Sequence, residues 1–190
     1  MTIAILALQG AFIEHEQMLH RIGHETLEIR NLADWQRYCS EVTETDRRLV
    51  IPGGESTAMT RIIRDEALYE PIREAILRGM PVLGTCAGII MLDANHLATM
   101  DIRVRRNAYG RQLGSFTANA PVAGIPSANE KPFPMVFIRA PYIESVGDGI
   151  EVLATVDSHI VAARQGNQLV CAFHPELMAD TRLHELFLSL

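Results

Sequence analysis

Hydrophobic runs and amphipathic segments alternate along the first half of the chain. Residues 3–8 form a continuous apolar run, which is typical of a strand buried on both faces of a sheet. Residues 12–22 carry apolar side chains at helical spacing, and Gly23 ends this predicted helix. The alternation predicts an α/β fold with a mainly parallel sheet covered on both sides. Its other predicted elements are strands at 26–29, 48–51 and from 81, and helices from 56 and over 69–77.

Strand patterns dominate the second half of the chain. Residues 165–167 predict a hairpin turn, and residues 183–190 predict a short closing helix. The stretch 121–134 contains four prolines, which indicates a surface loop. The predicted strands are 115–120, 135–138, 151–156, 160–164 and 168–173.

Length and composition indicate one soluble domain over residues 1–190. A chain of 190 residues suffices for one complete core and is small for two. Its 48% hydrophobic and 21% charged residues are ordinary for a globular protein. Because the formal net charge is −6, neither nucleic acid nor an anionic membrane is expected as a partner. A group of arginines indicates a local anion site, and its members are Arg103, Arg105, Arg106 and Arg111.

The spacing of cysteines and histidines argues against disulfides and metal sites. The three cysteines are far apart in the sequence, so neither a disulfide framework nor a zinc site is expected. His20 and His24 are four residues apart, but Gly23 interrupts the helix that a metal pair needs, and we expect neither a metal nor a cofactor. The apolar run at 3–8 is too short for a signal peptide or a membrane span, which favours a cytoplasmic location.

The segment Gly84-Thr85-Cys86-Ala87-Gly88 lies where an apolar run meets a predicted helix. A cysteine between glycines at such a junction is the sequence form of a nucleophile elbow, a tight strand-to-helix turn. The thiol then lies at a helix N-terminus, where the backbone dipole stabilises a thiolate. The alternative is a small buried cysteine packed between glycines. We favour the nucleophile for Cys86 and simple burial for Cys39 and Cys171.

The segment Phe173-His174-Pro175-Glu176 supplies candidate partners for the thiol. Pro175 favours an extended backbone at His174, and residues two apart in an extended chain project to the same side. We therefore expect His174 to activate Cys86 and Glu176 to orient the imidazole. These residue types predict acyl transfer through a thioester. The other histidines are expected to be surface or packed residues, namely His15, His96, His159 and His184.

The segment 52–57, Pro-Gly-Gly-Glu-Ser-Thr, has glycines whose backbone N–H groups can turn into a cavity, which suits an oxyanion hole. Ser56 or Thr57 is expected to cap the helix that follows. Because no lysine follows the glycines, a phosphate-binding loop is excluded. Arg106 and Arg139 are candidates for binding a substrate carboxylate, and a surface ion pair is the equal alternative for each.

Six segments, taken in order, carry a family resemblance. The chain resembles the glutaminase subunits of two-subunit pyridoxal 5′-phosphate synthases, which are class I, triad-type glutamine amidotransferases. The resemblance spans nearly the whole chain. The cysteine elbow and His-Pro-Glu mark only the superfamily, whereas the segments that begin at 53, 106 and 137 specify this branch. The six segments are 8–11 (LQGA), 52–57 (PGGEST), 84–88 (GTCAG), 106–112 (RNAYGRQ), 137–141 (FIRAP) and 173–177 (FHPEL).

This resemblance implies a flavodoxin-like, three-layer α/β/α sandwich and a glutaminase reaction. Cys86 would attack the side-chain amide of glutamine, His174 would relay the proton to departing ammonia, and Glu176 would hold the imidazole. Water would then hydrolyse the γ-glutamyl thioester to glutamate. The oxyanion-hole N–H groups would come from Gly54 and Ala87. The positions that contact glutamine in the family match Gly54, Glu55, Ser56, Arg106, Ile138 and Arg139.

The resemblance also implies a partner. Ammonia would pass to a synthase subunit that builds the pyridine ring from a pentose phosphate and a triose phosphate, with Gln9 and Gly10 near the interface. Compared with the family, the segment between 91 and 103 is shorter and that over 127–134 is longer, which affects the partner interface and leaves the triad intact.

Three other functions stay open at this point. The chain could serve another amidotransferase, such as imidazole glycerol phosphate synthase. It could be a non-catalytic regulatory partner subunit, against which the complete set of Cys86, His174 and Glu176 stands. It could also be a cysteine hydrolase of γ-glutamyl peptides.

Overall fold

The structure is a computed structural model of the chain, and it describes residues 1–106, 114–126 and 131–190. The helices are α1 (Phe12–Arg21), α2 (Leu32–Glu41), α3 (Ser56–Asp65), α4 (Tyr69–Leu77), α5 (Ala87–Leu92) and α6 (Arg182–Leu188), with short 3₁₀ turns η1 (Glu44–Asp46) and η2 (Pro175–Leu177). The strands are β1 (Thr2–Leu6), β2 (Glu25–Ile29), β3 (Leu49–Ile51), β4 (Val82–Thr85), β5 (Ile102–Arg105), β6 (Ser115–Ala120), β7 (Phe133–Ile138), β8 (Tyr142–Val146), β9 (Glu151–Val156), β10 (His159–Gln165) and β11 (Gln168–Cys171).

One nine-stranded sheet organises the described residues, with strand order β2-β1-β3-β4-β11-β10-β8-β5 and with β9 paired to β10. The neighbours from β2 to β11 are all parallel, which confirms the parallel sheet expected from the strand–helix alternation. From β11 onward the pairing is antiparallel. A separate two-stranded ribbon pairs β6 with β7.

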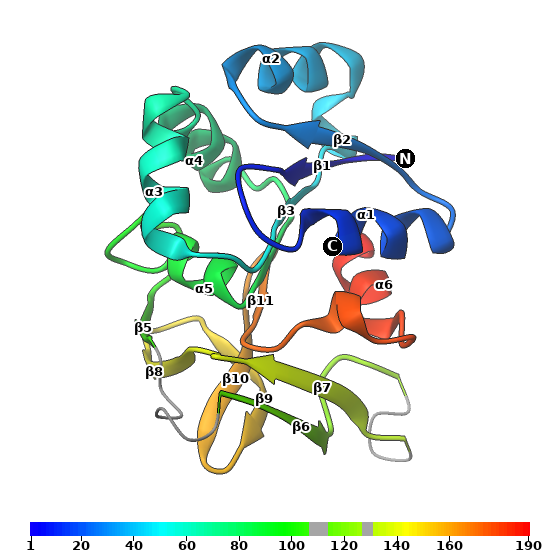
Figure 1. Cartoon of the computed structure of the whole chain (residues 1–190), viewed down its shortest axis with the longest axis vertical. Coiled ribbons are helices and arrows are strands. Elements are labelled where there is room, and N and C mark those ends of the chain that lie inside the picture. The colour runs from blue at the N-terminus through cyan, green and yellow to red at the C-terminus, as the bar shows by residue number, and fades with distance from the viewer. Residues whose placement is uncertain (107–113, 127–130) are drawn as a thin grey trace.

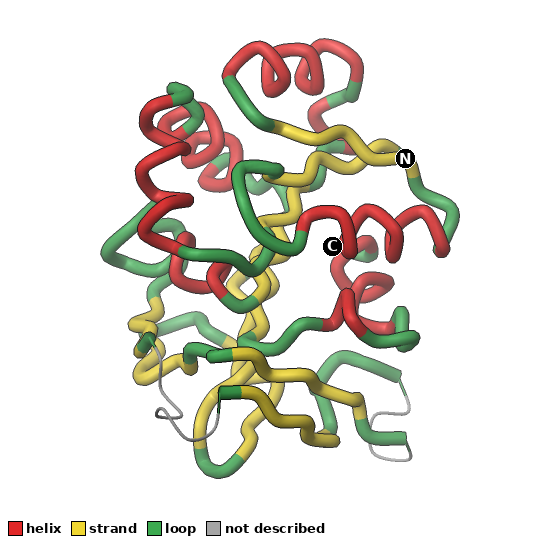
Figure 2. The backbone as a smooth tube through the Cα atoms, in the orientation of Figure 1, coloured by secondary structure: helices red, strands yellow, loops and turns green. Residues whose placement is uncertain are grey.

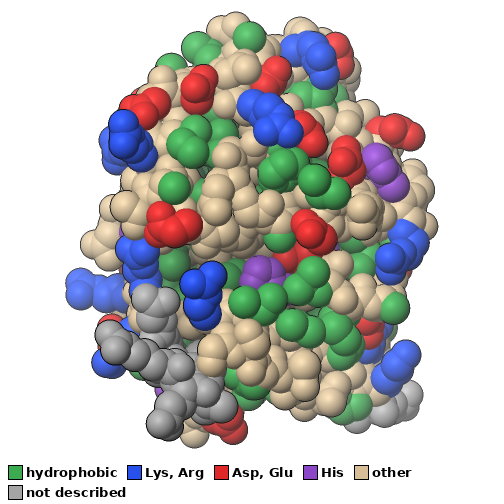
Figure 3. Space-filling view, in the orientation of Figure 1, with side chains coloured by type: hydrophobic (Ala, Val, Ile, Leu, Met, Phe, Trp, Pro, Cys, Tyr) green, Lys and Arg blue, Asp and Glu red, His purple; other side chains and the backbone are tan. Residues whose placement is uncertain are grey.

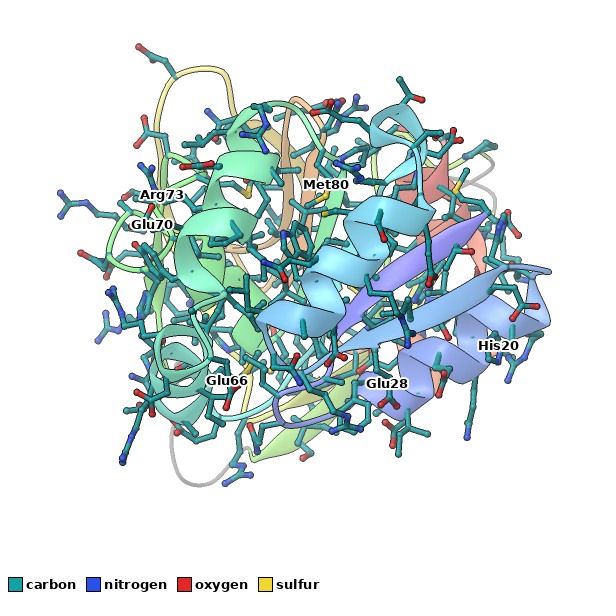
Figure 4. The ribbon with its side chains drawn as sticks, turned by 90° about the horizontal axis from the view of Figure 1, so that it is seen from above. His20, Glu28, Glu66, Glu70, Arg73 and Met80 are labelled. Carbon is teal, nitrogen blue, oxygen red and sulfur yellow. The ribbon has the colours of Figure 1, made fainter. Side chains whose placement is uncertain are left out.

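Helices cover both sides of the parallel strands. Figure 1 shows α1 and α6 together on one side of the sheet and α3 and α4 on the other, and Figure 2 shows the same strands running between these two groups of helices. Seen from above, α2 lies between α4, which carries Glu70 and Arg73, and α1, which carries His20 (Figure 4). This arrangement confirms the three-layer α/β/α fold.

The central strands are apolar because both of their faces are covered. All residues of β3, β4 and β11 are buried, as are Ile3–Leu6 of β1. Continuous apolar runs, rather than alternating ones, are what a sheet buried on both faces requires. Within the described residues, no helix is long and apolar enough to cross a membrane.

The structure corrects several sequence-based expectations. The stretch 121–134 is not simply a surface loop, because Val122 and Phe133 are fully buried and β7 begins at Phe133. The helix α2 was not predicted, although Asn31 accepts a hydrogen bond from Asp34 N and caps it. Strands β5 and β8 were also missed.

Candidate active site

Cys86 lies at a strained turn between β4 and α5. Its φ of 48° and ψ of −105° place a residue with a side chain in a region that favours glycine. A glycine is needed two residues later, at Gly88, because a Cβ there would lie 2.2 Å from Ile51 O. The close approach of α5 to β3 therefore explains the second glycine of the predicted elbow, and the thiol lies at the start of a helix as expected.

His174 and Glu176 meet behind the thiol. His174 Nδ1 lies 2.6 Å from Glu176 Oε1, and the Glu176 side chain is fully buried. The expected pairing is therefore present, but the local geometry differs from the extended chain that was predicted. His174 is close to extended, with φ −106° and ψ 86°, and Pro175 then begins the 3₁₀ turn η2 that carries Glu176.

The electrostatics of this pair favour an imidazolium–carboxylate arrangement. Burial lowers the pKa of His174, but its hydrogen bonds to Cys86 and Glu176 and the charges of both partners outweigh burial and raise the pKa to about 10. Burial raises the pKa of Glu176, but the neighbouring His15 ring and the hydrogen bond with His174 outweigh it and leave the pKa below its ordinary value. His174 is therefore protonated and Glu176 ionised at neutral pH.

A cleft of about 440 Å³ opens beside Cys86. Every residue predicted for the site lines it, except Glu176, which lies behind His174. The cleft sits at the carboxyl ends of parallel strands, because Gln9, Gly53, Cys86 and His174 follow β1, β3, β4 and β11. The sheet topology thus brings together segments that are far apart in the sequence.

Glu55 and Arg106 form one wall of the cleft. Glu55 caps α3 by accepting hydrogen bonds from Thr57 N (3.0 Å) and Ala58 N (2.7 Å). The expectation that Ser56 or Thr57 is the cap was wrong, because Ser56 is already the first helical residue. Arg106 Nη2 donates to Glu55 Oε1 and to Thr57 Oγ1, each at 3.2 Å. The two backbone hydrogen bonds, followed by lesser effects that include Arg106, lower the pKa of Glu55.

Arg106 and Arg139, the two candidates for binding the substrate carboxylate, differ in whether they form an ion pair. Arg106 does form an ion pair, with Glu55, inside the cleft. Arg139 is exposed, lines the cleft and has no carboxylate partner among the described residues. Its φ of 45° is left-handed, and its N–H donates to Gly114 O. The neighbouring carbonyl of Ile138 accepts from Cys86 Sγ at 4.0 Å.

The predicted oxyanion segment packs against the loop after β1. Ala11 N donates to Gly53 O at 3.0 Å, and Glu55 N donates to the Gln9 side chain. A Cβ on Gly10 would collide with Gly53 O at 1.8 Å, so only glycine fits there. Gln9 and Gly10 therefore contact the glycine loop directly. The predicted hole donors, the N–H groups of Gly54 and Ala87, belong to residues that line the cleft.

The three described members of the arginine group, Arg103, Arg105 and Arg106, do not converge on one anion site. Arg103 and Arg105 lie on β5, and Arg105 pairs with Glu144 at 3.4 Å. Of the arginines in this group that the structure describes, only Arg106 lines the cleft, and Arg111 lies outside the described residues. Across the described ranges, no group of three metal-ligating side chains is gathered.

Sequence reasoning did not connect His15 with the triad. It was expected to be a surface or packed residue, and it is fully buried in α1. Its Nε2 lies 3.3 Å from Glu176 Oε2 and 3.0 Å from Thr85 Oγ1. His15 shares the buried face of α1 with Met18 and Leu19, and this helical spacing is the one signal in the sequence that places it inside.

Comparisons with known proteins show the family of this chain. The chain matches the SNO glutamine amidotransferase family over residues 5–190. It is 51% identical to the pyridoxal 5′-phosphate synthase subunit PdxT of Streptococcus pneumoniae (strain ATCC 700669 / Spain 23F-1), covering 100% of this chain and 97% of that protein.

Solved structures agree as well. A glutamine amidotransferase crystal structure is 37% identical with a TM-score of 0.86, covering 98% of this chain and 97% of that one. A putative GMP synthase component from Thermoplasma acidophilum shares the fold, at 16% identity and a TM-score of 0.69, covering 100% of this chain and 92% of that one. The chain belongs to the SNO glutamine amidotransferase family.

Proposed function

We propose that this chain hydrolyses L-glutamine to L-glutamate and ammonia and delivers the ammonia to the synthase subunit of a pyridoxal 5′-phosphate synthase. Its family and its 51% identity to a curated subunit of that synthase support the reaction and the partner. The observation that carries the chemistry is the placement of Cys86 on a helix-initiating turn beside His174, which is in turn bonded to Glu176 at 2.6 Å.

Acylation begins with attack of the Cys86 sulfur on the side-chain carbonyl carbon of glutamine. A carbon–sulfur bond forms and the carbonyl electron pair moves to oxygen, where the N–H groups of Gly54 and Ala87 stabilise the negative charge. The imidazolium of His174 then donates its proton to the amide nitrogen. The carbon–nitrogen bond breaks, ammonia leaves, and a γ-glutamyl thioester remains on Cys86.

Deacylation reverses the role of His174. The neutral imidazole removes a proton from water, and the resulting hydroxide attacks the thioester carbon. The carbon–sulfur bond breaks, the new γ-carboxylic acid releases its proton to water as glutamate leaves, and the thiolate of Cys86 again faces the imidazolium. Glu176 holds the ring orientation throughout and stabilises its positive charge. Proton transfer and charge stabilisation in this mechanism require no residues besides the triad and the oxyanion donors.

The wall of charged residues suits a zwitterionic amino acid. The carboxylate of Glu55 can accept from the α-ammonium group of glutamine, and the guanidinium groups of Arg106 and Arg139 can bind its α-carboxylate. Ser56 and Ile138 line the same cleft and complete the set of glutamine contacts. Arg106 already pairs with Glu55. Binding of glutamine therefore replaces one ion pair within the protein by two ion pairs between protein and substrate.

The surface beside the cleft supports docking of a partner. Three exposed hydrophobic side chains lie in segments next to the catalytic residues, namely Ile13 (48% exposed), Ile138 (37%) and Leu177 (44%). Figure 3 shows hydrophobic side chains gathered near a histidine in the middle of this face. Burial of such side chains is a usual source of affinity between subunits.

We further propose that residues 1–190 work as one domain in the cytoplasm. A single continuous cluster of buried hydrophobic residues, running from Ile3 to Phe187, supports one domain. A reducing compartment suits a nucleophile that acts as a free thiol. Neither a metal nor a cofactor has a part in the proposed chemistry.

Glutamate release tests this function. It is measured for the chain alone, with purified pyridoxal 5′-phosphate synthase subunit, and with the synthase subunit of imidazole glycerol phosphate synthase. Stimulation by the first partner is expected, and Cys86→Ala should be inactive in each mixture. Stimulation by the second partner alone would favour the other amidotransferase. Turnover of γ-glutamyl peptides without a partner would favour the hydrolase, and silence with the folded chain would favour a regulatory subunit.

A further inference from the structure

A buried polar cluster lies behind the triad and outside the cleft. His15 of α1 and His184 of α6 are both fully buried, and His15 Nδ1 lies 3.1 Å from His184 Nε2. The other ring nitrogen of His15 faces Thr85, the residue before the nucleophile, and Glu176. His15 thus links α1 to the nucleophile strand β4, the 3₁₀ turn η2 and α6. It is not among the described residues that line the cleft.

The second oxygen of Glu176 gives this cluster its importance. Oε1 is bonded to His174, whereas Oε2 is buried and no donor among the described residues is in full hydrogen-bonding geometry with it. A buried carboxylate oxygen destabilises the folded protein when no donor or positive charge lies beside it. His15 Nε2, at 3.3 Å, is therefore the group whose protonation decides whether Oε2 is stabilised or repelled.

Both buried histidines are neutral. Burial lowers the pKa of His184 to about 3, and any positive charge on His15 would lower it further. Burial also lowers the pKa of His15 and outweighs the attraction of Glu176, while the nearby His174 acts in the same direction as burial. The titratable groups around His15 are thus Glu176 and His174 near η2, His184 on α6 and Glu14 on its own helix.

Two independent observations select the same tautomer. His184 Nδ1 is buried without a partner among the described residues, and an unused acceptor there costs less than an unused donor. The proton of His184 is therefore on Nε2 and is donated to His15 Nδ1. His15 then carries its proton on Nε2, on the side of Thr85 Oγ1 and Glu176 Oε2, which also avoids facing a lone pair toward the carboxylate.

We propose that His15 is a positioning residue for glutamine hydrolysis: its neutral Nε2–H, held by Thr85 Oγ1, places the positive end of its dipole beside Oε2 of Glu176, and His184 sets the tautomer that makes this possible. With Oε2 held, Oε1 stays on Nδ1 of His174, and the opposite ring nitrogen stays on Cys86. The functional unit is then Cys86, His174 and Glu176 supported from behind by His15 and His184. This inference rests on the proposed function of the triad.

The test compares His15→Leu with His15→Gln in the complex with the synthase subunit. Leucine removes the donor, and the glutamine amide can place an N–H near the position of Nε2. We expect His15→Leu to lower kcat by about 10- to 100-fold with KM for glutamine unchanged, and His15→Gln to recover most of that loss. Loss of the donor also raises the pKa of Glu176, so the acid limb of the kcat–pH profile should move to higher pH in His15→Leu alone.

The control separates positioning from general destabilisation. Ile72→Ala removes a fully buried side chain from α4, on the other side of the sheet, and should destabilise the fold without moving the pH profile. Turnover of the wild-type complex reports on the proposed function, and the contrast between variants reports on His15. A kcat in His15→Leu within twofold of wild type, or equal losses with unmoved profiles in both His15 variants, would overturn the proposal.

A second pair of variants covers the case in which His15→Leu does not fold. His184→Gln keeps a donor for His15 Nδ1 and His184→Leu removes it. We expect the leucine variant to lose several times more kcat than the glutamine variant, again with unchanged KM. Equal activity of the two would refute the assigned tautomer and with it the role of His15.

Discussion

Gly53 and the imidazole of His174 are in direct contact. A Cβ atom on Gly53 would lie 2.5 Å from His174 Cε1 and 3.2 Å from Cys86 Cβ. The glycine is therefore required by the approach of the catalytic ring to the loop after β3. Its neighbour Gly54 is less confined, because the nearest atom to a Cβ there is the side-chain oxygen of Gln9 at 2.6 Å, at the end of a flexible side chain.

Gly53→Ala should displace the imidazole and reduce kcat by about 100-fold, since a shift of about 1 Å at a catalytic group has an effect of that size. The fold should persist, because the added methyl group meets a side chain and not the core. The matched control is Gly114→Ala, whose Cβ would meet no atom of the described residues within 4 Å. Steady-state kinetics of both variants make the comparison, and equal activities would show that the ring has room to move.

Replacing Cys86 should reveal the strain of the elbow. At φ 48° glycine is favoured over alanine, so Cys86→Gly should be more stable than Cys86→Ala by about 1 kcal/mol. Cys171, in the regular strand β11, provides the contrast, because there the alanine variant should be the more stable. Urea unfolding measures all four, and the same order at both positions would argue against a strained nucleophile.

Arg139→Ala should mainly raise KM for glutamine, by about 10-fold or more, because one charge-assisted contact with the substrate carboxylate is lost. Arg105→Ala is the control, since Arg105 pairs with Glu144 on the surface and does not line the cleft. Initial rates over a range of glutamine concentrations separate KM from kcat. An unchanged KM in Arg139→Ala would return this residue to a surface role.

Protonation of His184 should contribute to acid unfolding. Its pKa is about 3 in the folded chain and near 6.5 when unfolded, so its stabilising contribution is present above pH 6.5 and is lost as the pH falls toward 3. Between pH 7 and pH 5 this one group should remove about 2 kcal/mol from the free energy of unfolding.

Urea unfolding at the two pH values checks the effect of His184. His184→Leu should lose about 2 kcal/mol less than wild type on acidification. Phe187→Leu, a buried and untitratable position on the same helix, should lose as much as wild type. If the free energy of unfolding of His184→Leu depends on pH as that of wild type does, protonation of His184 does not destabilise the fold.

Local patterns were sufficient for much of the fold. The bounds of α4, β6 and β9 match the predicted ones because their patterns end at clear turn signals. Strand β8 was missed because few of its residues are buried. Of its five residues only Ile143 is buried and Tyr142 is half-buried, and the other three are exposed. The burial of Val122 and Phe133 was not predicted, because the prolines around them indicated a surface loop.

The site divides in the same way. Cys86, His174 and the glycine loop were predictable because each needs a particular residue type at a tight turn or strand end. The contacts of His15 were not, because its partners Thr85 and His184 are 70 and 169 residues away in the sequence. Likewise, the ion pair between Glu55 and Arg106 joins residues that are 51 positions apart in the sequence. Contacts of this kind arise only from the packing of elements.

The central claim is that Cys86 attacks the side-chain carbonyl of glutamine. The most direct measurement uses the diazo-ketone analogue 6-diazo-5-oxo-L-norleucine, which alkylates a nucleophile bound at the side-chain position. The complex with the synthase subunit is treated, digested and examined by peptide mass spectrometry, with glutamine as a competitor. We predict a single adduct on Cys86, prevented by glutamine and absent in Cys86→Ala, with glutaminase activity lost in proportion to labelling. An adduct on another residue, or full activity after complete labelling of Cys86, would contradict the account.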